Sequence, residues 1–303
     1  MSDALQGVFP VFQTPFDKAD SIDFSTLEQE LQWLVERGAD GVVMAMVSET
    51  LRLSSDERDQ LAAFTCSTLQ GKVPVIISVG AESTHTTVRH ARAATRAGAT
   101  ALMAIPPVAT RLNDDGMMSY YQAILDASPL PLIIQDASGY IGNAMSLSLQ
   151  VALLEQYGPE RILFKPEANP IGPKLSHLRD ATGGRARVFE GSGGLALLDT
   201  YPRGIVGTMP GAELIDAQVA LWGALKKSDA TRAMALSEAI VSLVTLQAHS
   251  LDGFLVIEKY LLQKQGIFSN SRLRGPTGFD LDSETQSEVD RRFARLQSLV
   301  TTR

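Results

Sequence analysis

The segment LFKPEANP, residues 163–170, ends an apolar run with a lysine and follows it at once with proline. A lysine in this position can be an ordinary surface residue, with its stem buried and its ammonium group in water. Alternatively, Lys165 is a buried amine that attacks a carbonyl carbon at neutral pH. Such an amine can form a Schiff base with a 2-oxo acid, and the protonated imine then acidifies the adjacent C3–H.

Three further polar residues are candidates for catalysis beside that amine. Glu49 follows the apolar run GVVMAM and Glu167 lies two residues after Lys165, so either carboxylate can move protons. Each has a structural alternative, because Glu49 can bond to backbone amides at a helix entry and Glu167 can pair with a nearby Arg or Lys. Gln135 can orient a substrate oxygen, but its uncharged amide does not exchange protons as an acid does.

The elements that must position these residues follow from the hydrophobic pattern. Strand-like apolar runs alternate with helix-like amphipathic runs along residues 1–228, about eight times in all, which predicts an α/β protein with a (β/α)8 TIM barrel. The strands are continuous Val/Ile/Leu runs, as expected when both faces are buried. A doubly wound sheet is the rival fold, but no G-x-G-x-x-G follows the first strand. Residues 229–303 are predicted to form a C-terminal helical extension packed on the barrel.

In a barrel the active site lies at the C-terminal ends of the strands. Lys165 is the only one of the eight lysines that falls at such an end. The remaining candidates at strand ends, for binding substrate, are Ser48, Asp136, Glu190, Gly207, Thr208 and Met209. Ser48 and backbone N–H groups around Thr208 can bind a carboxylate. Asp136 can instead hold loop backbone, and Glu190 can instead form a structural pair.

Composition limits the classes of partner and cofactor. The chain has 303 residues and a net charge of -7 without basic clusters, so we expect neither a nucleic-acid partner nor binding to an anionic membrane. No apolar run approaches about 18 residues, the usual minimum for a membrane span, and the N-terminus lacks a signal-peptide pattern. We therefore expect a cytoplasmic protein. His85 and His90 are five apart and no H-x-x-x-H spacing occurs, so we expect no metal and no cofactor.

Several stretches along the chain form one pattern from about residue 7 to the end. They are VFPVFQTPF, GADGVVMAMVSETLRLSSDER, GAEST, AGATALMAIPP, PLIIQDASGYIG, FKPEA, FEGSG and GIVGTMPG. This pattern resembles the dihydrodipicolinate synthase/N-acetylneuraminate lyase superfamily, the class I Schiff-base aldolases and dehydratases. The resemblance implies that Lys165 carries the imine and that the protein is a homotetramer acting on a small-molecule 2-oxo acid without a metal.

The departures from the family pattern narrow the expected activity. The family's Gly-Thr-Thr-Gly-Glu is here the shorter MVSE, Gln135 stands in the position of a proton-relaying tyrosine, and a second, interface tyrosine is missing near PPVAT. Tyr140 aligns with the arginine that the synthase uses for its aldehyde substrate. These losses argue against lysine biosynthesis, and the pattern looks closest to the L-2-keto-3-deoxyarabonate dehydratase branch.

The expected function is therefore a Schiff-base lyase that removes water from a 2-keto-3-deoxy sugar acid and yields an oxo acid semialdehyde. Two alternatives stay open. A retro-aldolase would use the same imine but break a carbon–carbon bond and release pyruvate. A barrel that has lost catalysis would only bind a sugar acid, which the missing tyrosines make possible.

Overall fold

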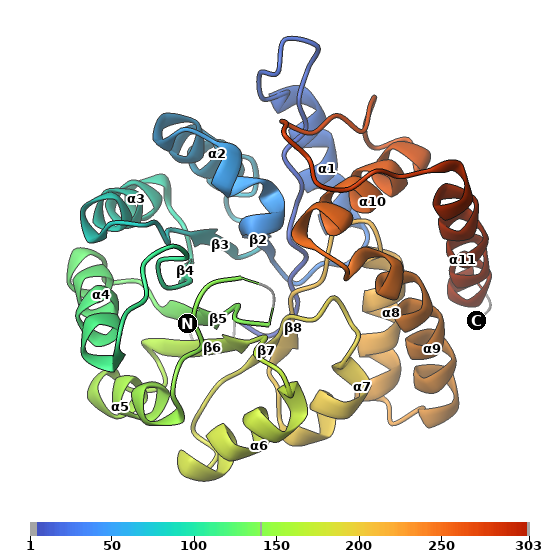
Figure 1. The fold of residues 1–303 in the computed structure, drawn as a ribbon. Coiled ribbons are helices and arrows are strands. Elements are labelled where there is room, and N and C mark those ends of the chain that lie inside the picture. The colour runs from blue at the N-terminus through green and yellow to red at the C-terminus, as the bar shows by residue number, and fades with distance from the viewer. Residues whose placement is uncertain (1–4, 140, 302–303) are drawn as a thin grey trace. The chain divides into compact units, whose positions relative to one another are not determined.

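The computed structural model describes residues 5–139 and 141–301 (Figure 1). Within these residues eight β-strands alternate with helices, and further helices follow the last strand, which confirms the predicted order of elements. The described chain divides into two compact units. Unit 1 consists of Leu53–Gly191 and Asp199–Gly207 with residues 5–6, and unit 2 consists of Gly7–Arg52, Ser192–Leu198 and residues 208–301.

Unit 1 contains strands β3 (Val75–Ser78), β4 (Ala101–Ala104), β5 (Leu132–Asp136) and β6 (Ile162–Pro166), which pair in sequence order within one parallel sheet. Its remaining strand, β7 (Phe189–Glu190), belongs to a second sheet. Its helices are α2 (Ser55–Thr68), α3 (Thr84–Ala97), α4 (Asp114–Ala127), α5 (Leu147–Tyr157), α6 (Ile171–Ala181) and the 3-10 turn η4 (Tyr201–Arg203). Strands β3 to β6 are hydrogen-bonded in parallel and every residue in them is buried. Figure 1 shows α2 to α6 on the outer side of these strands, each in contact with the next.

The helix ends of unit 1 follow local sequence signals. Helix α2 begins after Ser54, whose hydroxyl accepts the N–H of Glu57 while the Glu57 carboxylate accepts the N–H of Ser54, a reciprocal capping box. Helix α3 ends at Gly98, which has a positive φ of 89° that glycine adopts without steric cost. These ends set the lengths of the connections that lead into and out of the sheet.

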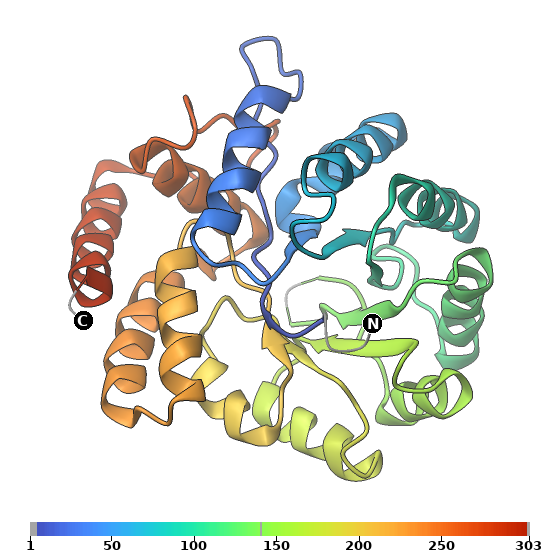
Figure 2. The ribbon, with the colours of Figure 1, turned by 180° about the vertical axis from the view of Figure 1, so that it is seen from behind.

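Unit 2 contains the first two strands and the C-terminal helices. Its elements are β1 (Gly7–Val8), α1 (Phe24–Glu36), β2 (Val42–Met44), the 3-10 turns η2 (Met46–Ser48) and η3 (Thr50–Arg52), α8 (Ile215–Lys226), α9 (Ala230–Gln247), α10 (Leu251–Lys264) and α11 (Ser283–Thr301). Helix α7 (Leu197–Thr200) and strand β8 (Gly207–Thr208) run across the chain boundary between the units. Figure 2 shows α8, α9 and α11 side by side, and these helices are in contact.

Strand β1 is much shorter than the apolar run GVFPVFQTPF that predicts it. Pro10 and Pro15 interrupt this run and, lacking an N–H, cannot donate to a neighbouring strand. Backbone pairing continues only where donors remain, since the N–H of Phe9 donates to Thr208 at 2.9 Å and that of Val11 to Pro210 at 2.8 Å. The chain therefore stays extended up to the polar residues at the end of this run, but it does not form a regular β-ladder.

The C-terminal part of the chain is helical, as predicted. Helix α9 packs against α8 and α11, with Leu236, Ile240 and Leu243 among its buried residues. The predicted domain boundary between residues 228 and 229 stays a prediction. In the described part of the chain no single helix is long and apolar enough to span a membrane, although α9 and α10 together, bent by 118°, have the length and composition.

Candidate functional site

The ends of strands β5 and β6 bring three polar side chains together in unit 1. In the parallel register of these strands Gln135 lies beside Lys165. Glu167 follows Lys165 by two residues, so its side chain points to the same side of the extended chain. The backbone N–H of Glu167 donates to the carbonyl of Asp136 at 2.8 Å and continues the pairing beyond the strand. Strand register and the side-chain period of two therefore decide which groups meet.

Lys165, Glu167 and Gln135 form one buried group. Nζ of Lys165 lies 3.0 Å from Oε1 of Glu167, and Nε2 of Gln135 donates to Oε2 of the same carboxylate at 2.6 Å. Lys165 is only 4% exposed, so the alternative in which its ammonium group lies in water does not hold. A buried amine beside a carboxylate that can take its proton is suited to nucleophilic catalysis.

Gly191 closes one side of this group. A Cβ at this position would lie 2.5 Å from Cε of Lys165 and 2.5 Å from Oε1 of Glu167, closer than atoms can pack. Only glycine therefore lets the backbone after strand β7 approach the amine and the carboxylate together. Glu190, the preceding residue, ends strand β7 and is 1% exposed, so it is a buried carboxyl in the same unit.

The Asp136 side chain bonds to the backbone of the loop that follows strand β5. Its Oδ1 accepts the backbone N–H of Ser138 at 3.1 Å, and its Oδ2 accepts that of Met145 at 3.1 Å. Both oxygens thus hold loop backbone, which is the alternative that the sequence left open for this residue. Tyr140, in the same loop, lies outside the described residues.

Ser48 lies in the 3-10 turn after strand β2, in unit 2. Its hydroxyl donates to the carbonyl of Phe12 at 2.6 Å and accepts the N–H of Ala45 at 3.2 Å. Thr14 donates to the Ser48 carbonyl at 2.6 Å. A hydroxyl has a single proton, and that of Ser48 is donated to the backbone. The Ser48 hydroxyl can therefore donate to a substrate only if its hydrogen bond to Phe12 breaks.

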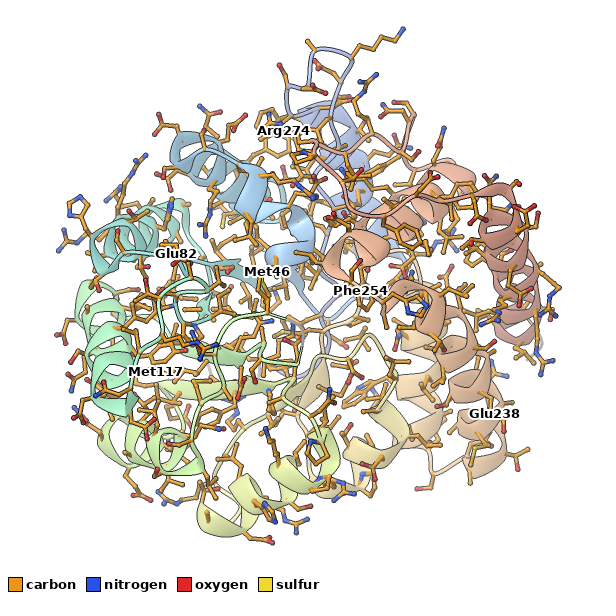
Figure 3. The ribbon with its side chains drawn as sticks, viewed as in Figure 1. Met46, Glu82, Met117, Glu238, Phe254 and Arg274 are labelled. Carbon is orange, nitrogen blue, oxygen red and sulfur yellow. The ribbon has the colours of Figure 1, made fainter. Side chains whose placement is uncertain are left out.

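Glu49 is also in unit 2, and its carboxylate has partners within that unit. It forms an ion pair with Lys259, lies 3.7 Å from the Arg52 guanidinium and accepts the backbone N–H of Arg274 at 3.3 Å. Arg274 is labelled in Figure 3. Glu49 is 1% exposed and has a positive φ of 56°, which is uncommon for a residue with a side chain. These contacts favour the structural alternative for Glu49, and a role in proton transfer stays a prediction.

The sequence did not single out Lys259, which proves to be a second buried lysine. Besides Glu49, its ammonium group donates to the carbonyl of Thr14 at 2.7 Å and to that of Arg272 at 2.9 Å, and it lies 4.6 Å from the centre of the Phe16 ring. Burial lowers the pKa of Lys259, while the Glu49 carboxylate opposes that change. The sequence could have indicated that Lys259 is buried, because Leu255, Lys259 and Leu262 lie on one face of helix α10.

Three buried carboxyl groups in unit 2 were likewise not predicted from the sequence. Glu30, Glu213 and Glu258 are at most 3% exposed, and Oε2 of Glu213 and Oε1 of Glu258 each lie 2.3 Å from the point where a Cβ on Gly211 would stand. Burial raises the pKa of Glu30 to about 8 and that of Glu213 to about 7, and it holds the pKa of Glu258 well above its usual range. We call these three residues the carboxyl cluster. Nothing in their spacing along the chain predicts that they meet.

The remaining predicted residues lie along strand β8 and just after it. Gly207 and Thr208 form the strand, and Thr208 and Met209 are buried at 0% and 2% exposure. The carbonyl of Thr208 accepts the N–H of Phe9, so this backbone is part of the β1–β8 pairing. Within residues 5–139 and 141–301, no group of three or more His, Cys, Asp or Glu is arranged to hold a metal ion.

A cavity of about 330 Å³ lies elsewhere in unit 2, among helices α1, α8 and α11. Its walls include Trp33 and Phe293, with Arg37 and Asp216 forming an ion pair of 3.5 Å. None of the residues predicted to be catalytic lines it. The chemistry of the Lys165 group therefore identifies the candidate site better than the size of this cavity does.

Comparison with known proteins identifies the family. The family model described as "Dihydrodipicolinate synthetase family" matches residues 4–295. The chain belongs to this family. Its relatives include an L-2-keto-3-deoxyarabonate dehydratase from Azospirillum brasilense, which is 27% identical over 97% of this chain and 96% of its own length.

Solved structures of the family establish the fold of the chain. A dihydrodipicolinate synthase from Rhodopseudomonas palustris has a TM-score of 0.88, with 26% identity over 97% of this chain and 98% of that one. A sialic acid aldolase from Ruminococcus gnavus has a TM-score of 0.85 at 20% identity, over 98% of each chain. The fold is accordingly a (β/α)8 barrel with C-terminal helices, as the sequence predicted. Synthases, dehydratases and aldolases share it, so family membership supports a lyase without choosing the reaction.

Proposed function

We propose that this protein is a class I lyase that forms a Schiff base between Lys165 and a 2-keto-3-deoxy sugar acid and removes water from it. The observation that carries the proposal is the buried pair of Lys165 and Glu167, 3.0 Å apart at the end of strand β6. Family membership supports the lyase class, and similarity along nearly the whole chain to a named 2-keto-3-deoxy acid dehydratase supports dehydration.

The first step transfers a proton within the buried pair. The Glu167 carboxylate accepts a proton from the Lys165 ammonium group, and the neutral amine attacks C2 of the substrate to form a carbinolamine. The C2 oxygen leaves as water when Glu167 returns its proton, and the protonated imine forms.

The second step is the elimination. The protonated imine withdraws electrons from C3, so the Glu167 carboxylate can remove a C3 proton and leave an enamine. The enamine electrons expel the C4 hydroxyl, which takes the proton from Glu167 and departs as water. The resulting unsaturated imine loses a proton from C5 and gains one at C3, which gives a C4=C5 enol that tautomerises to the C5 aldehyde. Hydrolysis of the imine then releases the oxo acid semialdehyde and the free lysine. Glu167 replaces Glu49 in this scheme because Glu49 is paired with Lys259.

Substrate binding rests on the residues predicted at the other strand ends. We propose that backbone N–H groups near Gly207, Thr208 and Met209 bind the substrate carboxylate, assisted by Ser48. Glu190 would meet the distal hydroxyl groups. The scheme uses no metal or cofactor. The wider setting, a cytoplasmic homotetramer that acts on a small-molecule 2-oxo acid and binds neither nucleic acid nor membrane, belongs to the same proposal.

Borohydride trapping with pyruvate tests the imine. We expect mass spectrometry to find the reduced adduct on Lys165, and Lys165→Arg to abolish both the adduct and turnover, while the exposed Lys72→Arg changes neither. Because Lys259 is also buried, peptide mapping must separate the two lysines. An adduct on Lys259 would refute the assignment to Lys165. No adduct on either lysine would refute the imine and favour a barrel that only binds sugar acids.

Product analysis tests the reaction. Incubation with 2-keto-3-deoxy aldonates of different configuration should yield an oxo acid semialdehyde that is detected by oxidation with an aldehyde dehydrogenase. Accumulation of pyruvate instead would identify a retro-aldolase, which shares the imine but expels an aldehyde. That result would leave the role of Lys165 intact and overturn only the dehydration.

A further inference from the structure

The polar contact of Gln135 points to a role that its position in the sequence did not suggest. The sequence led us to expect an amide that orients a substrate oxygen. In the structure Nε2 of Gln135 donates to Oε2 of Glu167 at 2.6 Å, while Oε1 of Glu167 faces the Lys165 ammonium group at 3.0 Å. Gln135 is 2% exposed, so this hydrogen bond is made in a buried environment.

We propose that Gln135 is a positioning residue that acts through Glu167, holding this carboxylate with one oxygen turned to the amine. The proposal rests on the proposed function, in which Glu167 carries the protons. An amide N–H favours the ionised form of a carboxylate that it donates to, and hydrogen bonds to charged groups are among the stronger ones. The amide itself stays neutral throughout the working pH range.

The surroundings restrict where the Glu167 carboxylate can turn. Its backbone N–H is bonded to Asp136, which fixes the start of the side chain. A Cβ at Gly191 would meet its Oε1 at 2.5 Å, and one at Gly139 would meet its carbonyl oxygen at 2.3 Å, so backbone packs closely on both sides. With one oxygen bonded to Gln135, the other is left in line with Lys165. The amide therefore selects one orientation of the proton carrier.

A charged or apolar residue in place of Gln135 would change this arrangement in opposite ways. A leucine removes the donor, so Oε2 of Glu167 loses the hydrogen bond that orients it. A glutamate keeps the shape but replaces the donor by an acceptor, so two carboxyl oxygens about 2.6 Å apart would have to share a proton. Neutrality and donor capacity are both needed, and glutamine supplies both.

Two variants and a surface control test the proposal. For Gln135→Leu we expect kcat to fall roughly 10- to 100-fold and the acidic limb of kcat/KM to move to higher pH by about one unit, with KM little changed. For Gln135→Glu we expect activity to fall as the pH rises and the introduced carboxyl loses its proton. Gln156→Leu, at an exposed position on α5, should leave the profile unchanged.

Borohydride trapping of the pyruvate imine at several pH values gives a readout that does not need turnover. A shift of its pH dependence in Gln135→Leu, matching the shift in kcat/KM, supports positioning. A raised KM with an unmoved pH profile would overturn the proposal, because that pattern means direct contact with substrate. If the variant does not fold, as judged by circular dichroism, the Gln135→Glu profile decides.

The same measurements separate this inference from the proposed function. If wild-type protein forms no adduct on Lys165, the proposed function fails. If the wild type and both Gln135 variants form the adduct on Lys165 and the yield depends on pH in the same way in all three, the proposed function stands and the positioning role is refuted.

Discussion

At the scale of single residues, the proposed chemistry depends on one carboxylate two positions beyond the lysine. Glu167→Gln removes the group that accepts protons but preserves its shape and its contact with Gln135. We expect kcat to fall roughly 10²- to 10⁴-fold, the usual contribution of general acid–base catalysis. Steady-state kinetics with the keto-deoxy acid measure this change. Glu155→Gln, in an exposed ion pair with Arg185, is the control and should be neutral.

Gly191 permits the contact between amine and carboxylate, so adding a methyl group should misplace both. Gly191→Ala puts a carbon 2.5 Å from Cε of Lys165, and we expect about a 100-fold loss of kcat from the displaced group. The control is Gly223→Ala in helix α8, where an added Cβ meets nothing within 4 Å. That change should stabilise the protein by roughly 0.5–1 kcal/mol. Equal activity in both variants would show that the close approach is unimportant.

At the scale of elements, the carboxyl cluster joins α1, α10 and the segment after β8, and it makes stability depend on pH. Oε2 of Glu30 and Oε2 of Glu213 accept no hydrogen bond from any described residue, and Lys259, whose charge acts on Glu30, is bonded to Glu49. Arg52 likewise lies beside Glu49, at 3.7 Å. Protons on the glutamates therefore relieve the repulsion between neighbouring carboxylates.

Stability should decrease as the pH rises from about 4.5 to about 8. The folded-state pKa values of Glu30, about 8, and Glu213, about 7, lie above the ordinary value of 4.5, so the folded state binds more protons than the unfolded chain in this range. Urea unfolding should show a loss of several kcal/mol across it. Glu213→Gln should flatten the profile, whereas Glu288→Gln on the surface of α11 should not. An unchanged slope in Glu213→Gln would contradict the assignment.

The ion pair between α10 and the turn after β2 should matter more for stability than any surface pair. Lys259→Met removes the cation bonded to the buried Glu49 and leaves only Arg52, 3.7 Å away, and we expect a loss of roughly 3–5 kcal/mol in the free energy of unfolding. The double variant Glu49→Gln/Lys259→Met removes both charges and should recover a substantial part of that loss. Lys72→Met, at an exposed position, is the matched control. Denaturant titration measures all three, and a loss below about 1 kcal/mol would refute the structural role.

At the scale of the whole molecule, the barrel fold is common to synthases, dehydratases and aldolases, so it does not select a reaction. The prediction at this scale concerns assembly. Sedimentation equilibrium should give four times the chain mass of 32.7 kDa, as the resemblance implies. A monomer that retains full activity would contradict the homotetramer and would mean that no residue of a second copy is needed for catalysis.

The sequence by itself determined the order of strands and helices, the family and the lysine at the end of the sixth strand. These features are local: the apolar periodicity of each element and a lysine that ends an apolar run can be read along the chain. The capping box at Ser54 and Glu57 is of the same kind, because its two partners are three residues apart.

Only the tertiary structure decided which polar groups meet. The sequence offered both Glu49 and Glu167 for proton transfer and favoured Glu49, but strand register sets Gln135 and Glu167 around Lys165, while Glu49 pairs with Lys259, 210 residues away in the chain. The carboxyl cluster unites residues from three distant segments in the same way. Such contacts depend on how elements pack, and the free energy of burying a charge depends on all of its neighbours at once, which no short stretch of sequence contains.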